Sequence, residues 1–262
     1  MAIIDWKIER EKGFSQVTLE IEGEPIISLE NYLKLVKALI FEANRDDVSV
    51  VLLTGPPEKF FFGMDISEIS ALKTTIATRG SSAAGQDLLN GLEASPASLI
   101  CAVDGTCFGG GLELAMVFHI IFATPSSSFG LPEIKVGTIP SFGGTQRLPR
   151  IVGRNRALRV MLTGETFSAQ TAKEWGLVTE VIPREDLIPT VQKLGRRVAA
   201  LSRHAVKALL RAAIKGLDTS LMSGLALESF NSSQLAGGQD LEEGIKAFFE
   251  KRSPLFPSTL EE

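Results

Sequence analysis

Three short, predominantly apolar runs constrain the fold of this 262-residue chain more than any other feature. They read VSVVLLT at 48–54, SLICAV at 98–103 and HIIFAT at 119–124. Runs of this length and composition are typical of strands buried on both faces of a parallel sheet. A strand at 15–21 precedes them, and segments with helical spacing lie between the strands, at 29–44 behind a candidate Ser28 cap, at 83–93 and at 111–117. The alternation of strands and helices predicts an α/β core.

The pattern changes after residue 143, where helical spacing dominates. Helices are predicted at 155–163, 168–175, 184–199, 202–215, 219–235 and 240–250. We therefore expect an α/β core over residues 1–195 and a helical region over 196–262. The small and polar segment 73–85 is predicted to be a mobile loop.

Composition and charge exclude several classes of protein. The net charge of −4 and the pI near 5.5 disfavour general nucleic-acid binding. The most apolar stretch, 107–123, is interrupted by Glu113 and His119, so no membrane span is expected. Two cysteines, Cys101 and Cys107, are too few for a disulfide scaffold, which favours a cytoplasmic location. His119 is expected to be a buried structural histidine and His204 part of a solvated basic face, which leaves a Ser-His-Asp hydrolase without support.

The strongest chemical signal is the segment DGTCFGGGLELAM at 104–116. Three glycines before a helix let backbone N–H groups face a ligand without obstruction by side chains. Such donors suit an anion, or an oxygen that becomes negative during a reaction. Glu113 lies in the first turn of the same helix, where it is either a reacting carboxylate or a complement to the helix dipole.

Two further segments add to this signal. Glu133, within FGLPEIKVGTIPSFGGTQR at 129–147, has apolar neighbours that would raise its pKa and suit it to general acid catalysis; the alternative is a loop carboxylate paired with Lys135 or Arg147. In FFFGMDI at 60–66, the glycine suggests close approach of the backbone to a ligand; the alternative is a turn in which Asp65 caps a helix at 66–72. Together these segments supply the donors and carboxylates that stabilise a thioester enolate and move protons.

This combination resembles the enoyl-CoA hydratase/isomerase family, also called the crotonase family. The matching segments are 104–105, 109–115, 129–133, 137–140, 143–148, 162–164, 168–178 and 243–252. The resemblance implies a crotonase-like spiral of ββα units with a C-terminal helical region. It also implies a homotrimer, often paired into a hexamer.

The resemblance further implies a 2-enoyl-CoA hydratase that binds an acyl-CoA. The backbone N–H groups of Met64 and Gly110 would form the oxyanion hole, Glu113 would activate water for attack at C3, and Glu133 would protonate C2. Coenzyme A enters as part of the substrate, and no metal or redox cofactor is needed. Substrate or CoA contacts are implied for Phe62, Asp65, Gly109 and Ser141, and for Phe248 and Lys251 in the CoA site of the same or a neighbouring subunit.

The chain departs from the family pattern at three places. Residues 22–27, EGEPII, lack the basic residue of the family's Asn-Arg-Pro run. Phe61, Phe62 and Met64 are bulkier than usual, and Ser141 stands where many hydratases have glycine. Three alternatives therefore stay open: a double-bond isomerase that uses Glu133 alone, a reaction on a carrier-protein thioester, and a catalytically silent binding subunit.

Overall fold

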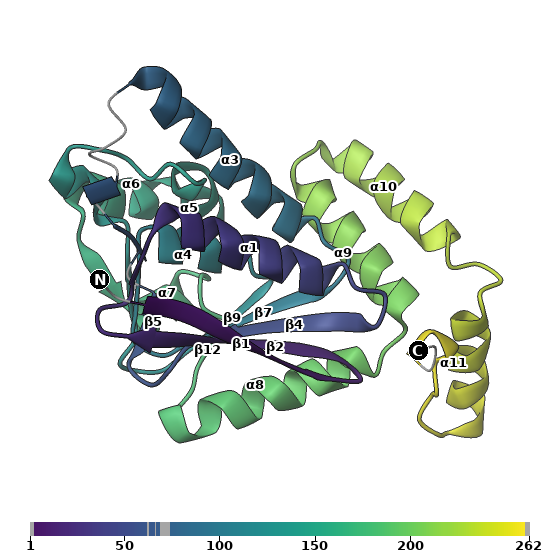
Figure 1. The fold of residues 1–262 in the computed structure, drawn as a ribbon. Helices are drawn as coiled ribbons and strands as arrows, with labels where there is room; N and C mark the ends of the chain where they lie inside the picture. Colours follow the sequence, from purple (N-terminus) through teal and green to yellow (C-terminus); the bar gives the residue numbers. More distant parts are fainter. Residues whose placement is uncertain (1–2, 62, 66, 69–73, 260–262) are drawn as a thin grey trace.

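The computed structural model describes residues 3–61, 63–65, 67–68 and 74–259. Within these residues, six strands form the larger sheet, in the order β1-β2-β4-β7-β9-β12 (Figure 1). β1 and β2 are antiparallel, and every later neighbour pair is parallel. The bounds are β1 (Ile3–Glu11), β2 (Gly13–Glu22), β4 (Val48–Thr54), β7 (Ser98–Val103), β9 (Ile120–Ala123) and β12 (Glu180–Val181). All three apolar runs of the sequence are therefore parallel strands, as predicted.

A smaller sheet of the described residues has the order β11-β10-β8-β5. Its strands are β5 (Lys59–Phe61), β8 (Thr106–Phe108), β10 (Ser128–Gly130) and β11 (Thr166–Ser168). β4, β7 and β9 of the large sheet are each followed by one strand of the small sheet and, after the short β6 in the first case, by a helical segment. This repetition is the predicted spiral of ββα units. A third pairing joins β3 (Ile26–Ile27) to β6 (Gly63–Met64).

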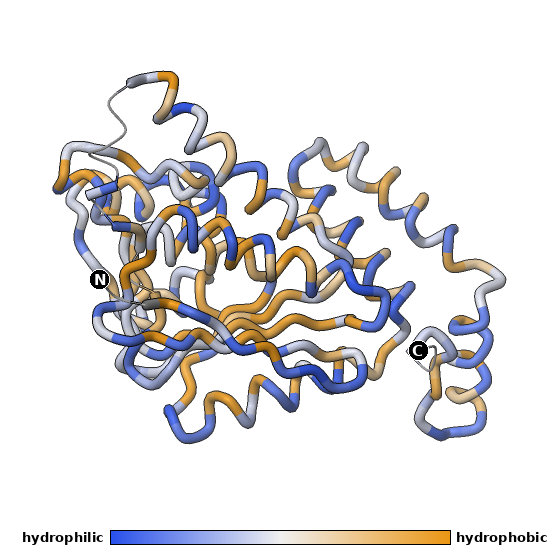
Figure 2. The backbone as a smooth tube through the Cα atoms, in the orientation of Figure 1, coloured by the Kyte–Doolittle hydropathy of each residue, from blue (hydrophilic) through white to orange (hydrophobic). Residues whose placement is uncertain are grey.

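Helices cover both faces of the large sheet (Figure 1). α8 (Arg184–Ala199) lies against one face, and α1 (Leu29–Ala43) and α3 (Thr75–Glu93) lie on the other. β4 shows why its central residues are apolar on both faces: Val51 and Leu53 belong to the core on the α1 side, and Val50 and Leu52 to the core on the α8 side. The hydrophobic strands between more hydrophilic helix surfaces are visible in Figure 2. Ser28 caps α1 as predicted, because its hydroxyl accepts the N–H of Asn31.

The remaining helical segments follow the small sheet or form the C-terminal region. They are α4 (Gly110–Ala115), η1 (Pro132–Val136), α5 (Gly144–Val152), α6 (Arg154–Thr163), α7 (Ala169–Glu174), α9 (Arg203–Leu217), α10 (Leu221–Ser233), α11 (Gln239–Glu250) and η2 (Pro257–Thr259). α8 runs across residue 195, and the division of the chain at that residue stays a prediction.

One local prediction is wrong. Segment 73–85, expected to be a mobile loop, is helical from Thr75 onward as the first half of α3. Thr74 caps this helix by accepting the N–H of Ala77, and small residues such as alanine and serine permit a helix once it is capped. β1 was not anticipated; it pairs with β2 along its whole length.

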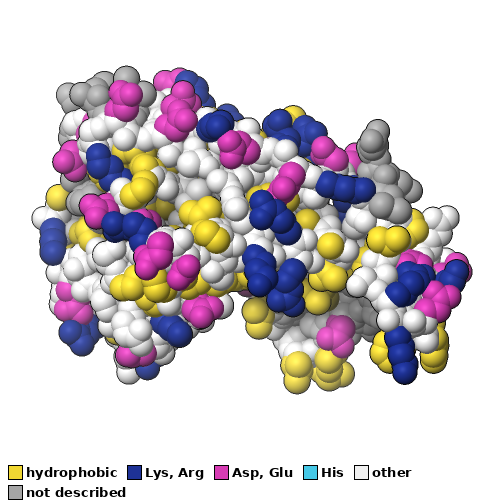
Figure 3. Space-filling view, turned by 90° about the horizontal axis from the view of Figure 1, so that it is seen from below, with side chains coloured by type: hydrophobic (Ala, Val, Ile, Leu, Met, Phe, Trp, Pro, Cys, Tyr) yellow, Lys and Arg dark blue, Asp and Glu magenta, His cyan; other side chains and the backbone are white. Residues whose placement is uncertain are grey.

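The C-terminal helices extend away from the core (Figure 1) and expose large apolar side chains. Leu217 is 88% exposed and Phe248 is 78% exposed. Basic and acidic side chains are interspersed over the face seen in Figure 3, and hydrophobic side chains are exposed where the C-terminal helices lie. In the part of the chain that the structure describes, no helix is both long and apolar enough to cross a bilayer.

Candidate active site

Three neighbouring strands of the small sheet bring the predicted site residues together. β8 pairs in parallel with β5 on one side and with β10 on the other. Parallel strands end at the same edge of a sheet, where ligands commonly bind in α/β folds. Met64 follows β5, Gly110 and Glu113 follow β8, and Glu133 follows β10. Residues far apart in the sequence therefore meet at one edge.

Glu113 is a buried carboxylate held by backbone donors. Its side chain lies in the first turn of α4, and the residue is 2% exposed. Its Oε1 accepts the N–H groups of Phe142 and Gly144, both at 2.8 Å. Burial raises the pKa of Glu113 to about 7, although these two N–H groups and the charge of Arg147 act in the opposite direction. The carboxyl group can therefore exchange a proton near neutral pH.

Glu133 lies in the 3₁₀ helix η1, behind Pro132. Its Oε2 is buried and has no hydrogen-bond partner among the described residues. Burial, together with the nearby charge of Glu113, raises its pKa to about 7. Neither alternative pairing is found among the described residues: the guanidinium of Arg147 binds Glu93 at 2.8 Å, and no ion pair joins Glu133 to Lys135. Glu133 is thus an unpaired carboxyl group beside a second carboxyl group, as a proton donor requires.

Gly110 is the first residue of α4, so its N–H has no carbonyl partner within the helix. The preceding N–H, of Gly109, donates to Gly130 O at 3.0 Å. Gly109 has φ 49° and ψ −128°, which only glycine adopts readily. A Cβ at Gly111 would lie 2.4 Å from the carbonyl oxygen of Phe61. Gly109 is therefore required by its backbone conformation and Gly111 by close packing.

The second expected donor, the N–H of Met64, lies beside Gly110. The N–H of Asp65 donates to Ile27 O at 2.9 Å within the β3–β6 pairing. Because successive N–H groups of a strand point to opposite sides, the N–H of Met64 points away from β3. A Cβ at Gly110 would lie 3.7 Å from Cγ of Met64, so the two residues are in contact distance. The structure thus brings both predicted donors to the edge that carries the glutamates.

The other predicted contact residues have varied placements. Phe62 lies outside the described residues. The carboxylate of Asp65 accepts the N–H and hydroxyl of Ser67, which is the capping arrangement, and the carbonyl of Ser141 accepts from Gln86 at 2.8 Å. Phe248 and Lys251 lie at the end of α11, across the molecule from α4 (Figure 1). Within one chain they do not reach the glutamates, and their contact with CoA stays a prediction that involves a neighbouring subunit.

Three supporting groups were not anticipated from the sequence. The N–H groups of Phe142 and Gly144 hold Glu113, and the Gly143-Gly144 pair was their only sequence signal. Tyr32, the one tyrosine of the chain, is buried and donates its hydroxyl to Gly110 O at 3.2 Å. The signal for Tyr32 was a polar hydroxyl on the apolar face of α1.

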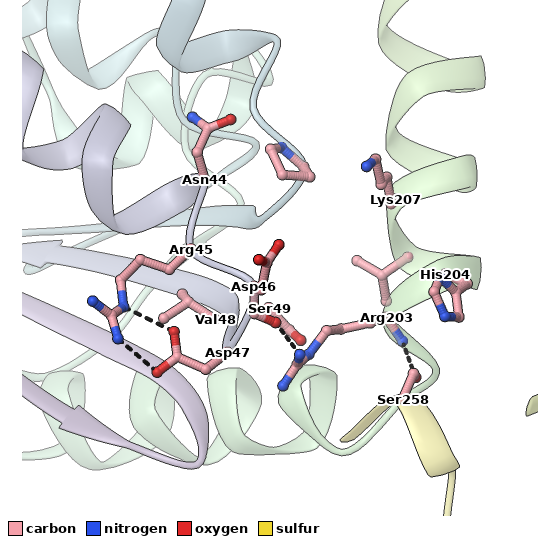
Figure 4. Close-up of a pocket in the computed structure, with 12 residues that line it drawn as sticks. Asn44, Arg45, Asp46, Asp47, Val48, Ser49, Arg203, His204, Lys207 and Ser258 are labelled. Carbon is pink, nitrogen blue, oxygen red and sulfur yellow. Dashed lines mark hydrogen bonds and ion pairs between the residues drawn. The ribbon is translucent and has the colours of Figure 1, made fainter. Parts of the chain in front are cut away.

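A cavity of about 730 Å³ lies elsewhere, between residues 44–49 and α9 (Figure 4). Two of its arginines have partners there: Arg45 binds Asp47 at 2.8 Å, and Arg203 bonds to the backbone carbonyl oxygen of Asp46. None of the predicted site residues lines it. His204, which does line it, is exposed, whereas His119 accepts the N–H of Leu99 at 3.0 Å as a structural histidine. We therefore place the candidate active site at the edge of the small sheet.

The geometry suits a reaction in which an oxygen becomes negative while protons move. N–H groups without a partner in a helix or strand pairing can stabilise a negative oxygen, and two carboxyl groups with raised pKa can accept and donate protons. The described residues contain no group of three or more acidic, histidine or cysteine side chains suited to a metal ion.

Comparisons with known proteins identify the family and the fold. The family model of enoyl-CoA hydratase/isomerase matches residues 15–259. The 2,3-dehydroadipyl-CoA hydratase of Escherichia coli is 37% identical over 86% of this chain and 87% of its own. The crotonyl-CoA hydratase of Syntrophomonas wolfei is 35% identical over 85% of this chain and 86% of its own. The crystal structure of an enoyl-CoA hydratase from Bacillus anthracis superposes with a TM-score of 0.89 and 31% identity, and covers 97% of this chain and 99% of that one.

Proposed function

The chain belongs to the enoyl-CoA hydratase/isomerase family, and on that premise we propose that it hydrates a 2-enoyl-CoA thioester to the 3-hydroxyacyl-CoA. The observation that carries the proposal is the pair of glutamates, Glu113 and Glu133, each with a pKa raised to about 7, at the sheet edge where α4 begins with Gly110. The hydratases named among its relatives support the same reaction.

In the proposed mechanism, the N–H groups of Met64 and Gly110 bind the thioester oxygen. Glu113, as the carboxylate, accepts a proton from water while the water oxygen bonds to C3. The electron pair of the double bond moves toward the thioester oxygen, where the two N–H groups stabilise the enolate. Glu133, as the carboxylic acid, then gives its proton to C2. The proton gained by Glu113 returns to Glu133 through solvent, which completes the cycle with one water added.

The raised pKa values support this division of roles. At neutral pH a carboxyl group with a pKa near 7 is present in both forms, so one glutamate can be ionised while the other is protonated. The charge of Glu113 raises the pKa of Glu133, which favours the state with the proton on Glu133. Water addition to an enoyl thioester is not a redox reaction, so the proposed chemistry requires no redox cofactor.

The acyl group is not specified by the relatives, because their names refer to different acyl chains at similar identity. A test therefore uses crotonyl-CoA with a panel of 2-enoyl-CoA and 3-enoyl-CoA thioesters and reads the products by mass spectrometry. Gain of one water on a 2-enoyl substrate is the expected result. A 3-enoyl substrate shifted to a 2-enoyl product without added water would instead assign an isomerase. No change on any thioester would contradict hydration of free CoA substrates.

The oxyanion role of Gly110 leads to a prediction with a matched control. Gly110→Pro removes the N–H at the first position of a helix, where proline is tolerated. We expect a folded protein with kcat lower by about 10²–10³-fold. Gly110→Ala keeps the N–H, and its Cβ would meet Met64 and Tyr32 at an ordinary 3.7 Å, so its kcat should stay within a few-fold of wild type. Normal turnover by a folded proline variant would remove Gly110 from the oxyanion hole.

We also propose that the chain assembles as a trimer or a pair of trimers. Large apolar side chains on the C-terminal helices are exposed in the single chain, and patches of this kind commonly mark interfaces. Light scattering after size-exclusion chromatography should give three or six times the chain mass of 28.2 kDa. A monomer at micromolar concentration would contradict the assembly.

A further inference from the structure

Tyr32 lies at the junction of the structural pieces that form the candidate site. It belongs to α1, and its side chain is fully buried. Its ring stacks on Phe61 with centroids 5.9 Å apart and on Phe142 with centroids 5.3 Å apart. Its hydroxyl donates to Gly110 O at 3.2 Å. One side chain of α1 therefore contacts the end of β5, the start of α4 and the loop that precedes α5.

Each residue that Tyr32 contacts supplies, or lies next to, a group with a proposed role in the reaction. Gly110 supplies an oxyanion N–H, and Phe142 supplies an N–H to Glu113. Phe61 ends the strand that precedes Met64. The hydroxyl of Tyr32 bonds to the backbone of Gly110 and its ring packs on two aromatic rings, so an effect of Tyr32 on the reaction acts through these neighbours.

The start of α4 needs support of this kind. It has three successive glycines, which have more backbone freedom than other residues, and α4 contains only six residues. A hydrogen bond to the Gly110 carbonyl from a different helix restricts the orientation of that residue. Side-chain packing alone does not require the hydroxyl, because phenylalanine would preserve both ring stacks.

We propose that Tyr32 is a positioning residue: its hydroxyl fixes Gly110, while its ring fixes Phe142, so that the oxyanion donor and Glu113 keep their relative placement. The proposal rests on the proposed function, because it assumes the roles of Gly110 and Glu113.

The test is Tyr32→Phe, which removes the hydroxyl and keeps the ring. We expect kcat to fall about 5- to 20-fold, as for the loss of one hydrogen bond to a positioned group, with KM within twofold of wild type. The second readout is the near-ultraviolet absorbance of bound acetoacetyl-CoA, whose enolate form depends on oxyanion stabilisation; the variant should bind less of it as enolate. Ile40→Val, on the same helix but facing Gly91 of α3, is the control for loss of stability alone and should leave both readouts unchanged.

Three results would overturn the positioning role of Tyr32, each for a different reason. If wild type shows the enolate band and Tyr32→Phe matches it in band and in kcat, the positioning role is wrong and the proposed function stands. If wild type binds acetoacetyl-CoA without any enolate band, the oxyanion role of Gly110 is wrong, and the positioning role is wrong with it. An equal loss of kcat in Ile40→Val would also overturn the proposal, because it would assign the effect to stability.

Discussion

Glutamine in place of Glu113 is expected to give a folded protein whose kcat for hydration is lower by about 10²–10⁴-fold. The amide oxygen of glutamine can replace Oε1 and accept the N–H groups of Phe142 and Gly144, which lie at 2.8 Å, so the surrounding loop should keep its place. The amide cannot take a proton from water, so the attacking oxygen is no longer activated. Initial rates on the preferred 2-enoyl-CoA, together with thermal melting, measure both parts of this expectation.

The control is Glu180→Gln, an exposed glutamate on β12 that should leave the rate unchanged. A comparison of Glu113→Gln with Glu133→Gln also distinguishes two reactions of the family. A hydratase needs both carboxyl groups, whereas a proton shuttle across a double bond needs one. Full activity of Glu113→Gln beside an inactive Glu133→Gln would therefore contradict the hydratase proposal and favour an isomerase.

Much of the core was predictable because its strands are buried on both faces. A predominantly apolar run such as 48–54 is unsuited to a solvent-exposed strand or a loop, and β4 occupies the predicted residues. The glycine triplet before Glu113 was equally informative, since both the conformation of Gly109 and the space beside Gly111 exclude other residues. These signals were readable because each depends on local steric constraints.

The failures came from segments whose own residues favour no single secondary structure. β1 has charges interleaved with apolar residues and is a strand because it pairs with β2. Residues 75–85 are small and polar, which is compatible with either a loop or a helix. Local propensity decides weakly in such segments, and capping and tertiary packing decide the outcome.

In the candidate site, too, some groups were predictable from the sequence and others were not. Glu113 and Glu133 were predictable because their side chains carry the chemistry, whereas the groups that hold them are mostly backbone N–H groups, which have no sequence signature. Tyr32 is separated from Gly110 by 78 positions, and the parallel pairing of β8 with its neighbours had to be known before the contact could be inferred. Sequence patterns therefore identified the reacting groups, and topology was needed for the positioning groups.

Glutamine in place of Glu133 is expected to lower kcat by about 10²–10⁴-fold while raising stability at alkaline pH. The loss of activity follows from the missing proton donor to C2. The gain in stability follows from burial: the folded pKa is about 7, raised from 4.5 by desolvation and by Glu113, so the folded protein holds this carboxylate in an unfavourable environment once it ionises. Glutamine stays neutral and removes that unfavourable charge.

The sign of the pH dependence follows from linkage. Because the folded pKa exceeds the unfolded value, the stability that the protonated Glu133 contributes is fully present below about pH 4.5 and is lost as the pH rises through about 7. The melting temperature of Glu133→Gln should therefore exceed that of wild type at pH 8, and the difference should shrink toward pH 5. Glu180→Gln serves again as the control and should show no such difference. If Glu133→Gln is inactive but melts at the same temperature as wild type at both pH 8 and pH 5, the folded protein does not raise the pKa of Glu133. Its role as a carboxylic acid at neutral pH would then lose its physical basis.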